Sequence, residues 1–432
     1  MMQSKAIILG ILYLSASLFA EGSWSLEDCL KQAKEKSLTL ENAKLREQQA
    51  LLSIKQTQIS GLPTVSASIQ NTLYDQPFVD GPKDHYRLNM GITGSYTLWD
   101  GGANGLGIEA GQISKEAAAL STRQTERNVQ ENVLNALVNL RAAKENLASA
   151  KKAVELAVAE NEHYGKLFEA GMITKKDLTQ SQSNVLQKKA AELTAELQVN
   201  TSKTTLRQLL ELPETEEFQI VTPEIAYHSP DSLPALPPMT ELKSQVMQNH
   251  PGLKSDSASV RAAHKNTEVA SKGNSVTVSL GANASTGLQA WESDRYGRQL
   301  KYGYQHSLTL GIHIPIVDCG ATENRVLMAQ VSESQSELTM QENAKSLDNN
   351  IEKIYLNALS SDMQWQAALL QVQAEQEALA VAEEQRNAGA LTYTDYLSQK
   401  NALERAETTL INAKYTSILS RKLIELYQGK LD

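Results

Sequence analysis

Two short motifs occur twice in this chain of 432 residues, and both recur after the same interval. Residues 98–102 read Leu-Trp-Asp-Gly-Gly, and residues 316–320, 218 positions later, read Ile-Val-Asp-Cys-Gly. A Gly-x-x-Thr motif with an Asp three residues after the Thr begins at Gly171 and again at Gly389, also 218 positions apart. A match at one interval over half of a chain indicates a duplicated structural unit. The segments between these landmarks are therefore expected to form two copies of one fold.

The first 20 residues have the features of a signal peptide. Lys5 supplies a positive charge, residues 6–19 are mostly apolar, and Ala20 is a small residue at a plausible cleavage position. The apolar run is short for a spanning helix, so we predict export and cleavage rather than a retained anchor. Without Lys5 the mature chain has 40 basic and 50 acidic residues, a net charge of −10. This balance argues against nucleic acid as a partner.

Long stretches without Gly or Pro predict unusually long helices. One lies between Gly111 and Gly165 and another between Gly320 and Gly389, and both are rich in good helix formers. At 1.5 Å per residue, some 65 residues make a rod of roughly 100 Å. A return helix follows each Gly motif, at about 174–210 and 392–427, so helical hairpins are predicted over 103–211 and 321–428. In the first rod, apolar residues alternate at steps of four and three, as in a coiled coil: Val129, Val133, Ala136, Leu140, Ala143, Leu147, Ala150, Val154 and Ala157.

Two other segments, 64–99 and 275–317, have the two-residue period of β-strands. Each predicts a hairpin with a weakly apolar face, a small polar face and aromatic residues at its ends, with polar connecting loops at 75–85 and 291–301. This pattern is typical of outer-membrane barrel strands, with a soluble sandwich as the alternative. Four strands cannot close a barrel, and an open edge in lipid leaves backbone groups unsatisfied. More than one chain must therefore contribute to the barrel.

The resulting organisation is a signal peptide (1–20), a first repeat (21–212), a linker (213–239) and a second repeat (240–432). The linker contains six of the eleven prolines within 26 residues, so no helix can cross it. Cys29 is predicted to begin the first helix and Cys319 to lie at the barrel end. We expect them to remain unpaired, because about 33 helical residues, roughly 50 Å, separate these places.

In its order of elements and motifs, with Asn249-His250-Pro251 opening the second copy, the mature chain resembles the TolC-type outer-membrane efflux proteins, the outer membrane factors. The resemblance implies an α+β membrane protein in the outer membrane of a Gram-negative bacterium. It implies a homotrimer that forms one 12-stranded β-barrel continued by a periplasmic tunnel of α-helices. It also implies partners, namely a periplasmic adaptor (membrane fusion protein) and an inner-membrane transporter that meet the periplasmic tips.

The same resemblance points to residues of the inner mouth of the tunnel. Better-studied members have two Asp three residues apart on the second return helix; here Asp395 matches the first, and Ser398 stands at the second position. In those members an Arg two residues after the second tip Gly pairs with the Asp that Asp177 matches here. Leu391 occupies that Arg position, and Arg386 is the nearest substitute. The pore or gate candidates are therefore Asp395, Asp177 and Arg386, and the adaptor-docking candidates are the tip residues Gly171, Met172, Gly389 and Ala390.

No catalytic, cofactor-binding or metal-binding constellation is recognisable, since there is no helical His pair, phosphate loop or nucleophile elbow. We therefore expect a passive exit duct of a tripartite efflux or type I secretion system. The loops at 75–85 and 291–301 should face outside the cell, and Gly171 and Gly389 should lie deep in the periplasm. An exported coiled-coil scaffold that never enters lipid is the alternative from another class, and a nutrient porin is a third. The exported substrate (drug, metal ion or protein), the pump and the adaptor are not separable from the sequence.

Overall fold

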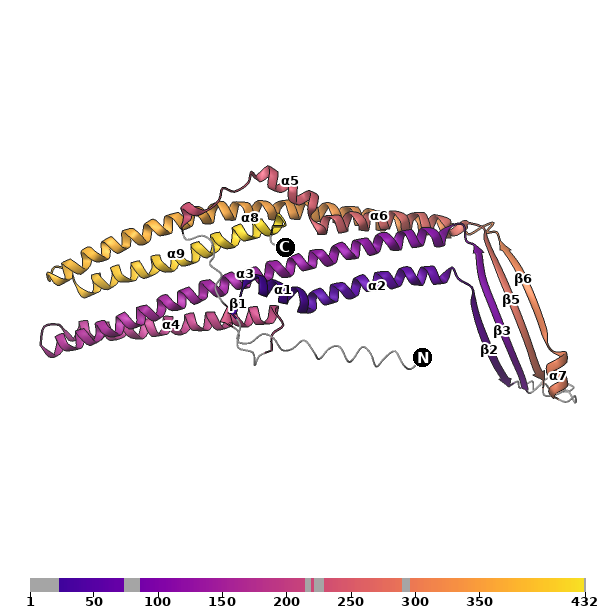
Figure 1. The fold of residues 1–432 in the computed structure, drawn as a ribbon, viewed down its shortest axis with the longest axis horizontal. Helices are drawn as coiled ribbons and strands as arrows, with labels where there is room; N and C mark the ends of the chain where they lie inside the picture. Colours follow the sequence, from indigo (N-terminus) through magenta and orange to yellow (C-terminus); the bar gives the residue numbers. More distant parts are fainter. Residues whose placement is uncertain (1–22, 74–85, 214–218, 221–228, 290–295, 431–432) are drawn as a thin grey trace. The chain divides into compact units, whose positions relative to one another are not determined.

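The computed structural model describes residues 23–73, 86–213, 219–220, 229–289 and 296–430 (Figure 1). The chain divides into two compact units. Unit 1 comprises Met1–Asn42, Arg123–His250 and Lys345–Asp432, and unit 2 comprises Ala43–Thr122 and Pro251–Ala344. Each unit takes segments from both predicted repeats, because the two longest helices run through both units. Among the described residues, no helix is long and apolar enough to cross a membrane.

Unit 2 contains one antiparallel sheet of four strands. The strands are β2 (Thr64–Leu73), β3 (Tyr86–Trp99), β5 (Thr277–Gln289) and β6 (Gln305–His313), in the order β2-β3-β5-β6. The two predicted hairpins are confirmed, and they meet through pairing of β3 with β5. Strands β2 and β6 each pair on one side only within the described residues, so the sheet has two open edges.

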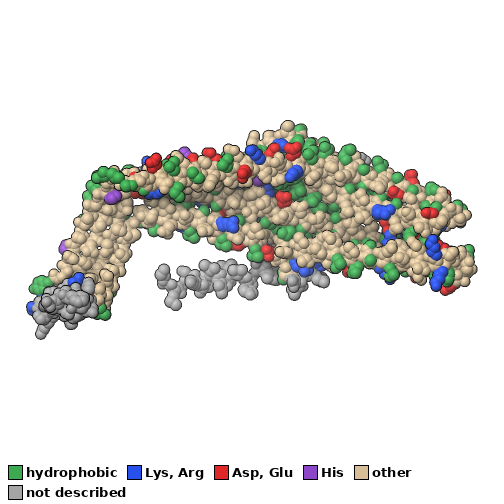
Figure 2. Space-filling model, turned by 180° about the vertical axis from the view of Figure 1, so that it is seen from behind, with side chains coloured by type: hydrophobic (Ala, Val, Ile, Leu, Met, Phe, Trp, Pro, Cys, Tyr) green, Lys and Arg blue, Asp and Glu red, His purple; other side chains and the backbone are tan. Residues whose placement is uncertain are grey.

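The register gives this sheet one apolar and one polar face. Apolar side chains on the first face are largely exposed, among them Val65, Ile69, Ile92, Leu308, Leu310 and Ile312. Ser, Thr, Asn, Gln and Gly dominate the other face. Figure 2 shows the sheet from one side, where few hydrophobic side chains are seen between its two ends. An exposed apolar face opposite a polar one is the arrangement of a barrel wall, with lipid outside and water inside.

The second hairpin differs from the sequence expectation at two places. The predicted strand to residue 317 ends at His313, because Pro315 has no backbone N–H to donate to a ladder. The predicted loop at 291–301 contains a short helix, α7 (Tyr296–Tyr302). The loop at 75–85 and residues 291–295 lie outside the described residues.

The first repeated motif connects a strand hairpin to each long helix. Asp100 Oδ2 accepts the N–H of Asn104 at 2.7 Å, and Asp318 Oδ2 accepts the N–H of Thr322 at 2.9 Å. Each Asp thus caps the start of a helix, α3 (Ala103–Glu169) or α8 (Ala321–Asn387). The residues after each Asp have positive φ, which favours Gly; Cys319, at φ 51, is the exception. Capping and turn geometry explain why this motif occurs in both copies.

Packing against α3 and α8 completes the rest of unit 2. It involves α2 (Leu38–Ser60), α6 (Pro251–Ser271) and a short 3-10 turn η2 (Lys272–Asn274). Thr122 Oγ1 donates to Ala43 O at 3.3 Å, and Ser255 Oγ donates to Ala117 O at 2.8 Å. Helix α2 of the first repeat and helix α6 of the second are thereby both bonded to α3.

Unit 1 is a bundle of the two helical hairpins, to which two short helices, a pair of two-residue strands and a 3-10 turn are added. The predicted hairpins are present as the distal parts of α3 and α8, each followed by a 35-residue return helix. The coiled-coil seam of α3 is confirmed, since Val133, Leu140 and Ala157 are fully buried. The other elements of this unit are α1 (Leu26–Lys36), α4 (Lys175–Leu209), α5 (Met239–Asn249), α9 (Tyr393–Tyr427), the parallel pair β1 (Ser23–Trp24) and β4 (Gln219–Ile220), and the turn η1 (Pro230–Ser232).

One core of unit 1 lies where α1 packs on α3 and α4. Trp24 and Cys29 contact Val133, Leu140 and Leu206 in this cluster. Burial raises the pKa of the Cys29 thiol to about 12, so the thiol stays protonated and unreactive. Cys29 and Cys319 are both free thiols, as predicted, and Cys319 is exposed.

Two helices of unit 1 carry apolar side chains that the described part of the chain leaves exposed. In α4 and α8 these side chains repeat at steps of three, four or seven, and each is at least half exposed: Leu186, Leu193, Leu197, Leu356, Leu359, Met363 and Leu370. Such a seam is ordinarily an interface. It provides a surface through which one chain can pack on another.

Candidate functional site at the helical tips

Each helical hairpin of unit 1 turns at its predicted Gly. Gly171 has φ +71 and Gly389 has φ +74, a conformation in which a side chain would be strained. Met172 N–H donates to Leu167 O at 2.9 Å, and Ala390 N–H donates to Gln385 O at 2.8 Å. These bonds close the outgoing helix in a Schellman motif. Met172 is 73% exposed, and Ala390 is exposed too, so both tips present side chains to a partner.

The two Asp candidates each lie in the first turn of a return helix. Thr174 and Thr392 are the N-caps, and their Oγ1 atoms accept the N–H of Asp177 at 3.3 Å and of Asp395 at 3.2 Å. Each Thr hydroxyl in turn donates to the carboxylate of its Asp at 2.6 Å. The structure therefore gives both carboxylates a role at a helix N-terminus, where a negative charge is favoured. In both copies, the Gly-x-x-Thr-x-x-Asp motif is therefore a tight turn followed by a helix N-cap.

The third candidate, Arg386, has a different partner from the expected one. Its guanidinium donates to Glu160 Oε1 at 3.3 Å and stands 4.2 Å from the ring centre of Tyr396. Among the described residues of one chain, Arg386 and Asp177 are not paired. The expected Arg386–Asp177 contact therefore stays a prediction, and it would have to form between neighbouring chains.

Glu160 is the charged centre of the tips, and the sequence analysis did not single it out. Besides Arg386 it accepts a hydrogen bond from Lys400 Nζ at 2.9 Å. The side chains of Glu160 and Lys400 are only 10% and 11% exposed. One carboxylate therefore joins three helices: α3 through Glu160, α8 through Arg386 and α9 through Lys400. The sequence did contain a hint of this ion pair. Lys400 lies three residues before Leu403 on the apolar seam of α9, and a charged side chain buried there needs a partner of opposite charge.

An aromatic cluster surrounds this charged centre. Tyr164, Tyr393 and Tyr396 are each less than 10% exposed and pack with Ala382 and Leu397. The ring centres of Tyr164 and Tyr393 are 4.4 Å apart. Burial raises the pKa of Tyr164 and of Tyr396 to about 12, so these phenols are neutral at physiological pH.

The contact between α4 and α9 is polar and incompletely satisfied. Among the described residues, Asn184 Oδ1 is buried without a hydrogen-bond partner, and the buried hydroxyls of Ser181 and Tyr393 lie next to each other. Burial raises the pKa of Tyr393, and the neighbouring Ser181 hydroxyl offsets part of that increase. Further from the tip, Lys188 Nζ donates to Asn401 Oδ1 at 2.7 Å and also pairs with Glu404.

The family model of the outer membrane efflux proteins matches residues 29–211 and 242–428, which include both hairpin tips and both sheet hairpins. The chain belongs to this family. Members are trimeric channels of the outer membrane, with a β-barrel and a periplasmic helical tunnel, and they conduct passively rather than catalyse a reaction. The predicted family, fold class and location are therefore confirmed, and a coiled-coil scaffold outside the membrane is excluded.

Solved structures agree with this assignment at the level of the fold. The transmembrane channel CusC has a TM-score of 0.79 at 17% identity, with 95% of each chain covered. The outer membrane channel CmeC of Campylobacter jejuni has a TM-score of 0.77 at 18% identity, covering 94% of this chain and 85% of that one. The open state of the Neisseria gonorrhoeae channel MtrE has a TM-score of 0.75 at 18% identity, covering 94% and 88%. Among curated proteins, no sequence matches the chain significantly.

Proposed function

We propose that this channel is the exit duct of a tripartite efflux or type I secretion system, coupled to an inner-membrane pump through a periplasmic adaptor. The main support is the pair of equivalent tips. Each ends in a tight turn closed by its own backbone bonds, with Met172 or Ala390 exposed beside the Gly. Rigid, exposed turns at the end of a helical tunnel are suited to docking by another protein. The working partners are then a homotrimer of this chain, the adaptor and the pump.

Site-specific cross-linking in cells tests the docking. Met172→Cys and Ala390→Cys, in a Cys319→Gly background, should each cross-link to a periplasmic adaptor, identified by mass spectrometry of the adduct. The matched control is Ser66→Cys on the polar face of β2, which lies in the barrel wall and should give no adduct. Absence of adducts from both tips in cells that still export substrate would contradict the proposal.

We also propose that charges at the tips regulate the inner mouth of the tunnel. Arg386 is fixed to Glu160 and Tyr396, while Asp177 and Asp395 face the first turn of the return helices. Three symmetric copies bring these charges around one axis, where a ring of carboxylates can hold cations and filter charge. Exposed ion pairs contribute only up to about 1 kcal/mol each, so such contacts bias the mouth toward closure without locking it.

Single-channel recordings of the purified trimer in planar bilayers test this mechanism. Arg386→Ser should raise the conductance, because it releases α8 from Glu160. Asp395→Asn should weaken block by divalent cations while the trimer stays intact. The control is Arg405→Ser, an exposed arginine on α9 away from the tip, which should conduct like the wild type. If Arg386→Ser and Asp395→Asn also behave like the wild type, the charges are ordinary solvated groups and packing alone closes the mouth.

A further inference from the structure

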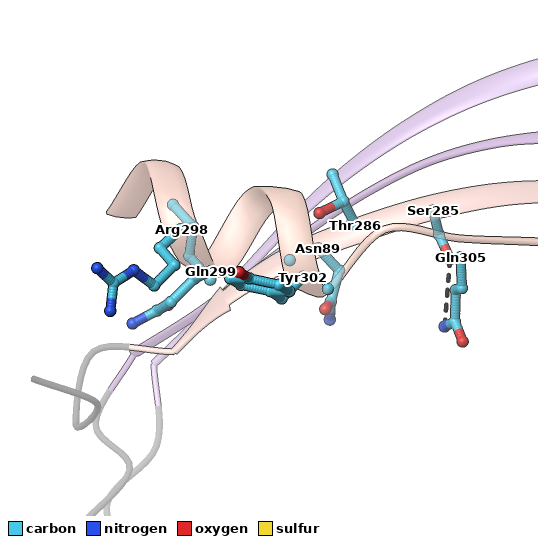
Figure 3. A pocket seen from close by; sticks show the side chains of 10 residues that line it. Asn89, Ser285, Thr286, Arg298, Gln299, Tyr302 and Gln305 are labelled. Atoms are coloured by element: carbon cyan, nitrogen blue, oxygen red, sulfur yellow. Dashed lines mark hydrogen bonds between the residues drawn. The ribbon is translucent and has the colours of Figure 1, made fainter. Parts of the chain in front are cut away.

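A polar pocket lies at the outer end of the sheet, between α7 and the strands. Its volume is about 570 Å³. Figure 3 shows the side chains that line it: Arg298, Gln299 and Tyr302 from α7, with Asn89, Ser285 and Gln305 from three neighbouring strands. Neither the tips nor the barrel wall accounts for this pocket.

Strand register decides on which side of the sheet α7 stands. Asn89 of β3 pairs with Gly287 of β5, and Ser285, two residues earlier on β5, pairs with Gln305 of β6. Residues that pair directly or lie two apart share a face. Asn89, Ser285 and Gln305 therefore all belong to the polar face, whereas Thr286 and Leu288, which also line the pocket, pair with Met90 and Leu88 on the other face. Helix α7 thus stands at the end of β5, and its pocket includes side chains of the polar face.

Specific contacts hold α7 in this position. Thr286 Oγ1 donates to Leu300 O at 2.7 Å, and Gln299 is only 8% exposed. Gly303, directly after α7, lies close to β5, since a Cβ there would lie 2.9 Å from Gln299 O and 3.5 Å from Gly287 O. A larger residue at position 303 would disturb the join between α7 and β5.

The hairpin that contains α7 is longer than the equivalent hairpin of the first repeat. Val65 to Trp99 spans 34 positions, whereas the equivalent Val276 to Val317 spans 41, and α7 has seven residues. One copy per chain gives three copies in the trimer.

We propose that α7 projects over the outer mouth of the channel and that Arg298 and Tyr302 line the path by which solutes leave. The polar face is the inside of the barrel, and Arg298 and Tyr302 are both exposed and line a pocket that they share with Asn89, Ser285 and Gln305 of this face. Three guanidinium groups around the exit act on the permeating ions by their charge. The inference rests on the barrel of this family and is independent of adaptor docking and of the inner mouth.

Stepwise chemical modification of single channels tests the position of α7. Arg298→Cys is placed in a Cys319→Gly background, where the remaining thiol, Cys29, is buried. A negatively charged methanethiosulfonate added to the outer side should change the current in up to three equal steps, one for each chain. The control is Leu308→Cys on the apolar face, which should give no step. If mass spectrometry shows Cys at position 298 fully modified while the current is unchanged, α7 lies outside the path and the proposal is wrong.

Charge substitution gives a second, independent result. In a salt gradient, Arg298→Glu should shift the reversal potential toward cation permeability, whereas Arg298→Lys should leave it near the wild-type value. Equal reversal potentials for Arg298→Glu and the wild type would overturn the assignment of Arg298 to the permeation path.

Discussion

Glu160→Gln is expected to loosen the tips by releasing three helices at once. The substitution keeps the size of the side chain but removes the charge that Lys400 Nζ contacts at 2.9 Å and Arg386 contacts at 3.3 Å. Glu160 and Lys400 are each about nine-tenths buried, so Lys400 is left as a buried cation without its partner. Breaking a buried pair in this way costs about 3–5 kcal/mol. Arg386 is 28% exposed and can turn to solvent, so its loss adds no more than about 1 kcal/mol.

Taking the lower limit, about 3 kcal/mol, the open state of the tip should become roughly 100-fold more populated, since about 1.4 kcal/mol is a factor of ten. Hydrogen exchange measured by mass spectrometry over peptides from 376–400 should show this as faster exchange of the same order. Glu160→Gln with Lys400→Met should recover most of the protection, because no buried charge remains. Glu126→Gln is the matched control, because its partner Lys34 is 59% exposed and the pair should contribute less than about 1 kcal/mol. A change below threefold for Glu160→Gln would refute the reasoning.

Three other changes test the fold and its electrostatics. Leu193→Glu should weaken the trimer, seen by native mass spectrometry, because it places a carboxylate on the exposed apolar seam of α4; Gln187→Glu, exposed on another side of α4, should not. Gly389→Ala should destabilise the second tip by about 1 kcal/mol, seen as faster local hydrogen exchange, because its φ is +74. Burial, and to a lesser extent the charge of Arg127, lowers the pKa of His250 from 6.5 to about 4. Between pH 6.5 and 4, His250 therefore stays neutral in the folded protein, while it binds a proton in the unfolded chain. Stability should therefore fall with pH from 6.5 to 4, by up to about 3 kcal/mol per chain in thermal or denaturant unfolding, and His250→Phe should reduce this slope.

The repeating parts of the fold were predictable because periodicity reports directly on burial. The return helices expected at about 174–210 and 392–427 are Lys175–Leu209 and Tyr393–Tyr427. Their starts follow from Thr-x-x-Asp caps, which are local and need no tertiary information. The strand hairpins followed in the same way from a two-residue period with one apolar face.

The elements that were predicted wrongly lie where the sequence pattern was ambiguous or where the structure depends on residues distant in the sequence. Alternation of Ile312, Ile314 and Ile316 suggested a longer β6, although Pro315 cannot donate to a ladder. Helix α7 is only seven residues long, too short for a helical period to be recognised within a polar loop. Gly303, which follows it and lies close to β5, looks like an ordinary loop glycine in the sequence.

The site was the least predictable part. Glu160 and Arg386 are 226 positions apart, and the contact depends on how α3 and α8 pack at the tips. Sequence comparison by motif suggested Asp177 as the partner of Arg386, but within one chain Asp177 is engaged by Thr174. A carboxylate such as that of Asp177 can either cap a helix locally or pair with a distant cation. The sequence does not show which of these two contacts it makes.

The central claim is that several copies of this chain form one channel, because four strands with two open edges cannot close a barrel in lipid. The direct test is native mass spectrometry of the mature protein in detergent, combined with channel recording of each separated species in planar bilayers. The account predicts a trimer that conducts and a monomer that neither inserts nor conducts. A monodisperse monomer that forms channels would contradict it.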